Sequence, residues 1–240
     1  MAGGIRRTKL WDLPVRLVHW SLVALLPALW WTGEEGEIDL HRTLGLIMLG
    51  LVVFRVLWGL YGSSTARFAS FVKGPRAVLA YVRGLRGGEH RAVAGHNAAG
   101  GWSVVILLSL LAAQVSVGLF AQDVDGIASG PLNYMVSYET GDALRGVHGL
   151  LFNLILLFAI VHIAAIIFYT FVKKDPLVPP MVSGSRDLPE DLPPPRIAPL
   201  WKAIPAAVLA AALAVWIGMG APRSLEQATA PPLPSAEDYM

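Results

Sequence analysis

The chain has 240 residues, of which 55% are hydrophobic and 15% are charged, and its mean hydropathy is +0.55 with a formal net charge of +2. This apolar composition is atypical of a soluble globular protein and excludes a disordered chain. The absence of cysteine excludes disulfide scaffolds, iron–sulfur clusters and thiolate zinc sites. The composition therefore indicates an integral membrane protein, in which any redox chemistry uses a cofactor held by other side chains.

Five long apolar runs follow one another along the chain, at residues 15–31, 44–60, 102–120, 147–172 and 204–219. Each approaches or exceeds the roughly 17 residues with which a helix crosses about 30 Å of hydrocarbon. Runs of this length are helical in lipid, because lipid offers the backbone no hydrogen-bond partners. We therefore expect an all-α integral membrane fold, with residues 1–172 forming a four-helix transmembrane core.

The composition changes after the fourth run. Eight prolines lie between Lys173 and Lys202, where they prevent a continuous helix and favour an extended tether. We predict a Pro-rich cytoplasmic tether over residues 173–202, a fifth transmembrane helix over residues 203–220 and a periplasmic tail over residues 221–240. The fifth run is rich in alanine and has no ionisable residue in its interior, which is typical of an anchor or a close-packing helix.

The charges of the loops alternate. Basic residues precede the first run, separate the second from the third and follow the fourth, whereas the loops after the first and third runs are acidic. By the positive-inside rule, the N-terminus lies in the cytoplasm and five crossings place the C-terminus in the periplasm of a bacterial inner membrane. The basic residues are topology signals of this kind, so the net charge does not indicate a nucleic-acid partner.

Four of the six histidines lie at two matched depths of the predicted bundle. His19 and His162 lie toward the cytoplasmic side, in the first and fourth helices, and are called the inner pair. His41 and His148 lie toward the outer side, in the second and fourth helices, and are called the outer pair. His148 and His162 are fourteen residues apart, which corresponds to a rise of about 21 Å and a return to within about 40° of the starting direction. They therefore share one helix face.

Two imidazoles that face each other across a bundle coordinate one flat macrocycle from both sides. The two pairs therefore predict two bis-histidine haems, and the lack of cysteine for thioether attachment makes them b-type. Small residues beside the ligands leave room for a porphyrin: Gly45, Gly149, Ala159 and Ala165. The alternative is that these histidines are hydrogen-bonding or interfacial residues. No Asp or Glu lies inside an apolar run, which disfavours a pump or transporter.

Further polar residues lie beside the predicted ligands. Arg16 and Arg55 are suited to haem propionates, and snorkelling to anionic lipid headgroups is the alternative for both. His96 precedes the third helix and is suited to hydrogen-bonding a quinone carbonyl or a propionate. Its alternative role is to start that helix together with Asn97. Two more cations flank the outer pair: Arg42 and Arg145.

Four segments of the sequence carry a family resemblance. They are LWDLPVRLVHW (residues 10–20), LHRTLGLIMLGLVVFRVLWGLYG (40–62), GHNAAGG (95–101) and VHGLLFNLILLFAIVH (147–162). The chain resembles the prokaryotic cytochrome b561 family, which includes the cytochrome b subunits of nickel-iron hydrogenases. The resemblance implies a four-helix membrane bundle that holds two b haems. The haem ligands that it implies are His19, His41, His148 and His162.

The resemblance also implies a function and partners. Members of the family pass electrons between the membrane quinone pool and a redox partner, such as a periplasmic cytochrome c or a dehydrogenase or hydrogenase subunit. We therefore predict transmembrane electron transfer through two b haems. The acidic outer loops suit a basic cytochrome c, but topology alone also predicts them. Two alternatives remain: a stand-alone haem-dependent superoxide or quinone oxidoreductase, and a cofactor-free anchor for an extrinsic protein.

Overall fold

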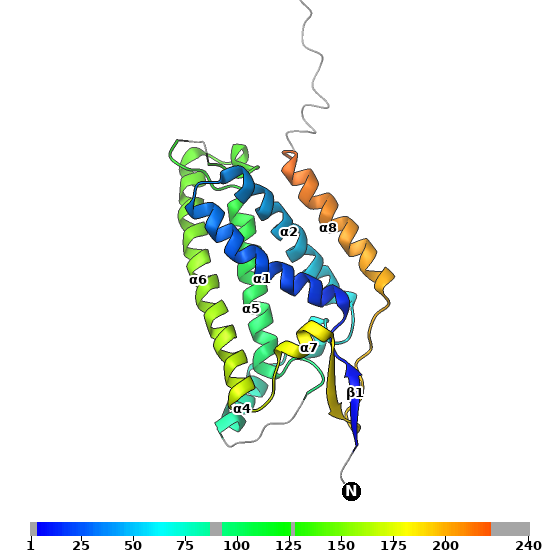
Figure 1. Ribbon diagram of the computed structural model, residues 1–240. Coiled ribbons are helices and arrows are strands. Elements are labelled where there is room, and N and C mark those ends of the chain that lie inside the picture. The colour runs from blue at the N-terminus through cyan, green and yellow to red at the C-terminus, as the bar shows by residue number, and fades with distance from the viewer. Residues whose placement is uncertain (1–3, 87–92, 126–127, 222–240) are drawn as a thin grey trace, which may run out of the picture.

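The computed structural model describes residues 4–86, 93–125 and 128–221, and helices dominate this part of the chain (Figure 1). The elements are β1 (Ile5–Lys9), α1 (Leu13–Glu34), α2 (Ile38–Tyr61), α3 (Phe68–Phe71), α4 (Pro75–Arg86), α5 (Ala98–Gly118), η1 (Asn133–Met135), α6 (Tyr138–Phe171), α7 (Val178–Ser183), β2 (Ser185–Pro189), η2 (Leu200–Lys202) and α8 (Ala203–Gly218).

Among the described residues, five helices are long and apolar enough to cross a membrane: α1, α2, α5, α6 and α8 together with η2. The prediction of a multi-pass, mainly helical membrane protein is therefore confirmed. The fourth spanning helix is longer than its apolar run predicted, because α6 begins at Tyr138 rather than near Val147. Ser137 caps α6 by accepting a hydrogen bond from the backbone N–H of Thr140, which lets a polar segment extend the helix.

Helix α2 is central among the spanning helices, because it packs against three of the other four. Close contacts join α1 to α2, α2 to α5 and α5 to α6, and α8 lies along α2 on the side away from α6 (Figure 1). Within the described residues, α1 and α6 face each other without extensive direct contact.

One face of α2 points into the bundle. His41, Gly45, Met48, Val52 and Arg55 follow one another at spacings of three or four residues, which places them on one side of a helix. Met48 and Val52 form a buried apolar cluster with Leu108 of α5. An apolar layer therefore fills the middle of the bundle between the two levels of histidines.

The first spanning helix is fixed at its start by Asp12. One carboxylate oxygen of Asp12 accepts a hydrogen bond from the Val15 N–H (2.8 Å) and so caps α1, whose first turn contains Pro14. The other oxygen accepts a bond from the indole N–H of Trp58 in α2 (2.9 Å). Asp12 and Trp58 are both buried. One side chain therefore begins α1 and joins it to α2.

A small sheet departs from the all-α prediction. Strands β1 and β2 pair antiparallel, with Ile5 opposite Pro189 and Lys9 opposite Ser185. Gly184, with a φ of 83°, ends α7 in the left-handed conformation that favours glycine, and its carbonyl accepts hydrogen bonds from the N–H groups of Leu10 and Trp11. Residues 173–202, expected as an extended tether, thus contain a short helix and a strand. Residues 222–240 of the expected tail lie outside the described residues.

The fifth spanning helix packs closely on α2. Ala206 and Ala210 of α8 are buried, and a Cβ built at Gly50 of α2 would lie 3.7 Å from the Ala210 carbonyl oxygen. Small residues on both sides let the two backbones approach each other. This packing matches the close-packing role expected for an alanine-rich helix.

Replacing Ala210 with leucine is expected to destabilise the protein by about 1–3 kcal/mol, because the larger side chain has no room against α2. A lower midpoint of thermal unfolding in detergent would report this effect. Ala211→Leu is the matched control, since Ala211 is exposed on the same helix. Equal midpoints for the two variants would contradict the observed packing of α8.

Candidate functional site

The outer pair brings two imidazoles close together between α2 and α6, in an edge-to-face arrangement. The ring centres of His41 and His148 are 6.3 Å apart, with their planes inclined by 73°. His41 Nδ1 lies 2.9 Å from the carbonyl oxygen of Leu29 in α1, and His148 Nδ1 lies 3.1 Å from the carbonyl oxygen of Gln114 in α5. A carbonyl only accepts hydrogen bonds, so each Nδ1 carries the proton and each Nε2 retains a free lone pair.

The spacing of the outer pair fits a metal ion held between the two rings. Two metal–nitrogen bonds of about 2 Å, with about 1 Å more from each nitrogen to its ring centre, place the ring centres about 6 Å apart. Hydrogen bonding of the second ring nitrogen to a carbonyl is also typical of histidine ligands. The outer pair therefore has the donor atoms, proton positions and spacing of a bis-histidine site.

The backbone lies close to the outer pair where glycine permits it. A Cβ built at Gly118 would lie 2.9 Å from His148 Cε1, and one built at Gly33 would lie 3.4 Å from His41 Cε1. Nothing lies within 4 Å of a Cβ built at Gly45, one turn from His41 on the same face of α2. The site thus combines tightly held rings with open space beside one of them, which suits a flat macrocycle.

The inner pair lies toward the other end of α6 and takes its second histidine from α1. His19 of α1 and His162 of α6 are within electrostatic range of each other. His162 Nδ1 lies 3.3 Å from the hydroxyl oxygen of Ser103 in α5. His19 Nδ1 is buried and has no hydrogen-bond partner in the described part of the chain. An unpaired nitrogen beside a facing imidazole fits the same kind of ligand site as the outer pair.

Buried apolar side chains separate the two pairs. Ile155 of α6, halfway between His148 and His162, is 1% exposed, and it lies on the same helix face because it is seven residues from each. Together with the Met48, Val52 and Leu108 cluster, it closes the middle of the bundle to water. The two sites are therefore separate polar centres in an apolar interior.

Both predicted arginines contact the protein. Arg55 is 6% exposed, donates a hydrogen bond to the Ala66 carbonyl (3.3 Å) and lies over the Phe68 ring at 5.3 Å. Arg16 donates a bond to the Val182 carbonyl (2.7 Å), and its Nε is buried without a partner among the described residues. The positions of these side chains favour a role inside the bundle over snorkelling to lipid headgroups.

His96 lies between two aromatic rings near the inner pair. Its ring centre is 4.7 Å from that of Trp11 and 4.6 Å from that of Phe71. Burial, with a smaller contribution from the Arg55 charge, lowers the pKa of His96 to about 3. Its Nδ1 has no partner within the residues that the structure describes. Asn97 alone caps α5, through a 2.7 Å bond from the Gly100 N–H, so His96 is left for another role.

The arginines beside the outer pair are engaged elsewhere. Arg42 donates two hydrogen bonds to the Ser129 carbonyl (2.8 and 3.1 Å), and Arg145 pairs with Asp142 at 2.9 Å. Both guanidinium groups are therefore bonded to groups other than the outer histidines.

Sequence reasoning missed the groups that orient the rings. The Leu29 and Gln114 carbonyls are backbone atoms, so no residue type marks them, and the hydroxyl of Ser103 lies in an otherwise apolar helix. The role of Gly33 and Gly118, which is to leave room for the histidine rings, can be recognised only from the structure. The spacing of the histidines along the helices was the available signal.

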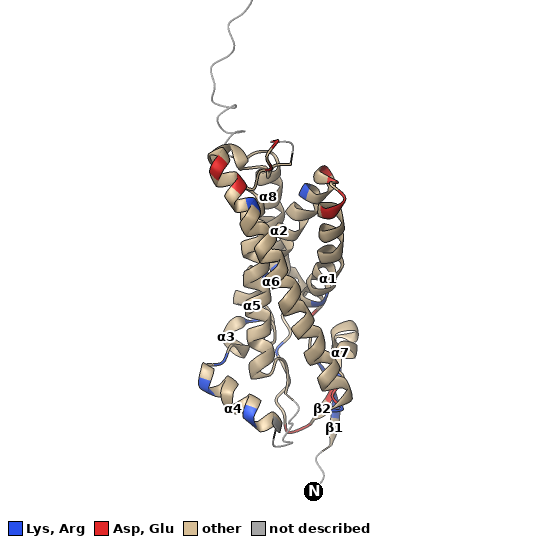
Figure 2. Cartoon of the chain, turned by 90° about the vertical axis from the view of Figure 1, so that its left-hand side faces the viewer, with Lys and Arg blue, Asp and Glu red and all other residues tan. Residues whose placement is uncertain are grey.

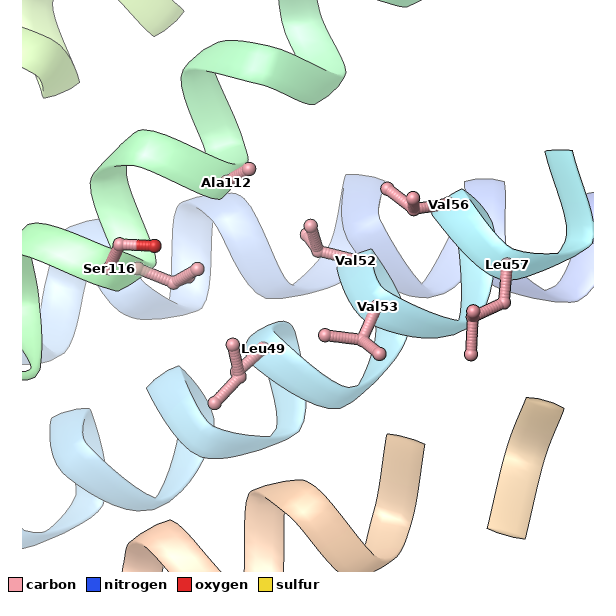
Figure 3. A pocket seen from close by; sticks show the side chains of 8 residues that line it. Leu49, Val52, Val53, Val56, Leu57, Ala112 and Ser116 are labelled. Atoms are coloured by element: carbon pink, nitrogen blue, oxygen red, sulfur yellow. The ribbon is translucent and has the colours of Figure 1, made fainter. Parts of the chain in front are cut away.

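Two other features bear on what the site is. Across the described residues, no group of three or more His, Cys, Asp or Glu side chains could hold a metal ion, but a porphyrin supplies four nitrogens and needs only two axial ligands. A groove of about 210 Å³ lies between α2 and α5, and Figure 3 shows side chains that line it. Its lining is apolar apart from the Ser116 hydroxyl, so this groove is not the metal site.

Comparison with known proteins gave one family match. A family model described as prokaryotic cytochrome b561 matches residues 10–184. This range contains both histidine pairs, both arginines and His96, and it ends before α8. Comparison with curated proteins and with solved structures gave no match.

Proposed function

Because the chain belongs to the prokaryotic cytochrome b561 family, we propose that it transfers electrons across the membrane through two b-type haems. The family supports haem b binding and transmembrane electron transfer. The observation that carries the proposal is the geometry of the outer pair, with rings 6.3 Å apart and both Nδ1 atoms bonded to carbonyls. His162 of the inner pair lies about 21 Å from His148 along α6, and its electrostatic interaction with His19 supports a second site there.

The chain's own residues would hold and tune these sites. His41 and His148 ligate the outer haem, and His19 and His162 ligate the inner one. At the outer pair, hydrogen bonds from Nδ1 to carbonyls would make the ligands more basic and fix the ring orientation. Bound haem b supplies a one-electron couple, and the protein supplies position, dielectric and local charge. The apolar layer around Ile155 keeps water from the space between the sites.

Arg16, Arg55 and His96 are proposed to bind the inner cofactor. Arg16 lies three residues before His19 in α1, and the Arg55 charge acts on His96. Both guanidinium groups can pair with haem propionates. His96 is neutral at neutral pH, and its unpaired Nδ1 can hydrogen-bond a propionate or the carbonyl of a quinone. We therefore place the quinone site at the inner level, beside His96.

The charge distribution supports a topology and a partner face. Asp and Glu gather where α1 meets α2 and where α6 begins, while Lys and Arg mark α4 and β1 at the other end (Figure 2). We propose that the basic end and the N-terminus face the bacterial cytoplasm and that the end of α8 faces the periplasm. The acidic end would then dock a basic periplasmic cytochrome c, or a dehydrogenase or hydrogenase subunit.

A reduced-minus-oxidised visible spectrum of the purified chain, with a haem-to-protein ratio, tests the proposal. A ratio of about two supports it, and a ratio of about one leaves one histidine pair structural. Colourless protein from haem-replete cells would remove the proposal. Quinol or superoxide turnover without any partner protein would instead assign a stand-alone oxidoreductase.

Replacing Arg55 with glutamine is expected to lower the midpoint potential of the inner site by tens of mV, since a nearby positive charge favours the reduced state. A redox titration followed at the haem absorption bands measures this shift. Arg55→Lys keeps the charge and is expected to restore most of the potential. Unchanged midpoints in a fully loaded Arg55→Gln protein would place Arg55 outside the cofactor site.

A further inference from the structure

Helix α4 lies outside the five spanning helices but is fixed to two of them (Figure 1). The Tyr81 hydroxyl is 2.5 Å from the Tyr169 hydroxyl of α6. Lys173 Nζ donates a hydrogen bond to the Leu85 carbonyl at 2.8 Å, near the C-terminal end of α4, where a cation also interacts favourably with the helix dipole. One face of α4 is therefore docked against the end of α6.

The contacts of α4 define its depth relative to the membrane. Tyr169 lies two residues before the end of α6. At the other end of α4, the indole N–H of Trp102, in the first turns of α5, donates to the Lys73 carbonyl at 2.8 Å. Tryptophan and tyrosine at the ends of spanning helices are typical of the interface between hydrocarbon and water. Helix α4 is thus held at the level of the lipid headgroups.

The face of α4 turned away from the bundle is apolar along one edge. Leu79 is 51% exposed and Val82 is 42% exposed, which resembles the exposure of apolar residues on the spanning helices. Large apolar side chains exposed next to each other on a short surface helix indicate contact with lipid or with a partner. The position of α4 favours lipid over a partner protein, because its exposed apolar residues lie at the same depth as the ends of α5 and α6 that enter the hydrocarbon.

Two arginines border this apolar edge. Arg76 and Arg83 are exposed and lie three residues before and four residues after Leu79, so all three fall within about a quarter turn of each other. Neither arginine forms an ion pair with an acidic residue that the structure describes. Figure 2 shows basic residues, in blue, on α4. Exposed cations beside apolar side chains complement the anionic headgroups of a bilayer surface.

We propose that α4 is a membrane-surface helix that binds anionic phospholipid headgroups of the cytoplasmic leaflet through Arg76 and Arg83 and inserts Leu79 and Val82 among the acyl chains. The proposal rests on the topology of the proposed function and not on its haem content. The two proposals can therefore fail separately.

Spin labels test the depth of α4 directly, because the full chain has no cysteine. Single variants Leu79→Cys, Val82→Cys and Ala80→Cys are labelled in nanodiscs of phosphatidylcholine with phosphatidylglycerol. Collisions with oxygen are expected to dominate at positions 79 and 82, and collisions with a water-soluble nickel chelate at exposed position 80. Dominance of the nickel chelate at all three positions overturns the insertion, and so does exclusion of both reagents at positions 79 and 82, which would indicate cover by a second protein surface.

Lipid binding tests the arginines. The double variant Arg76→Gln/Arg83→Gln is expected to retain several-fold less phosphatidylglycerol than the wild type in native mass spectrometry of the purified chain. The charge-matched control is Arg6→Gln/Arg7→Gln, since both of these arginines are exposed on β1. Equal loss in the two variants, or no loss in either, overturns the headgroup site. Both variants are expected to keep the wild-type haem ratio, so this outcome is independent of the redox proposal.

Discussion

Replacement of His162 by alanine is expected to lower the haem content from about two to about one per chain, because the inner site loses one of its two axial ligands. The loss is expected to be larger for the inner haem than for the outer one, whose ligand on the same helix, His148, lies about 21 Å away along α6. Some loss from the outer site is also expected, since both sites share this helix. The pyridine haemochrome assay and the protein concentration of the same sample give the ratio.

The matching variant at the outer level is His148→Ala, which is expected to remove the other haem. The two variants should therefore leave haems with different midpoint potentials, because carbonyls bond both Nδ1 atoms of the outer pair, whereas a hydroxyl lies beside one Nδ1 atom of the inner pair. A His148→Ala/His162→Ala double variant is expected to be nearly colourless. Full occupancy of both sites in the His162→Ala protein would show that the assigned pairing is wrong.

Asp12→Ala is expected to destabilise the protein by about 2–4 kcal/mol, because three losses coincide. Helix α1 loses its cap at Val15, the buried indole N–H of Trp58 loses its acceptor, and the nearby guanidinium of Arg55 loses a countercharge. Unfolding in mixed micelles of mild detergent and dodecyl sulfate, followed by circular dichroism, measures the change in free energy.

Asp12→Asn provides the control for this prediction. Its amide oxygen still caps α1, whereas the amide N–H₂ group cannot accept the bond from Trp58. Its loss of stability is therefore expected to lie between those of the wild type and Asp12→Ala. Wild-type stability in Asp12→Ala would mean that the link between α1 and α2 does not depend on this carboxylate.

The spanning helices could be predicted because the membrane imposes their length and apolar character. The approach of His41 to His148 also followed from sequence, since both lie near the outer ends of α2 and α6, which cross the membrane in the same direction. The early start of α6 did not, because residues 138–146 are polar and only the Ser137 cap marks the helix end. The β1–β2 pair was missed because its strands are about 180 residues apart and are only five residues long.

The candidate site could likewise be predicted only in part from the sequence. Residue types with a chemical signature, such as histidine and arginine in apolar runs, could be singled out beforehand. Their orientation depends on backbone carbonyls and on glycines that allow close approach, and these carry no such signature. Arg42 shows that a position next to a predicted ligand does not reveal the contacts of a side chain. It follows His41 directly, but it donates its hydrogen bonds to the carbonyl of Ser129 in a distant loop.

The pairing of β1 with β2 has a consequence for biosynthesis. Strand β1 leads directly into α1, which carries His19, and β2 follows α6, which carries His162, so the pair ties together the two helices of the inner level. A ribosome makes the N-terminal strand first, and this strand has no partner until residues 185–189 have emerged. The β1–β2 link between α1 and the segment after α6 is therefore absent for most of translation. It forms only after α1, α2, α5 and α6 have all been made.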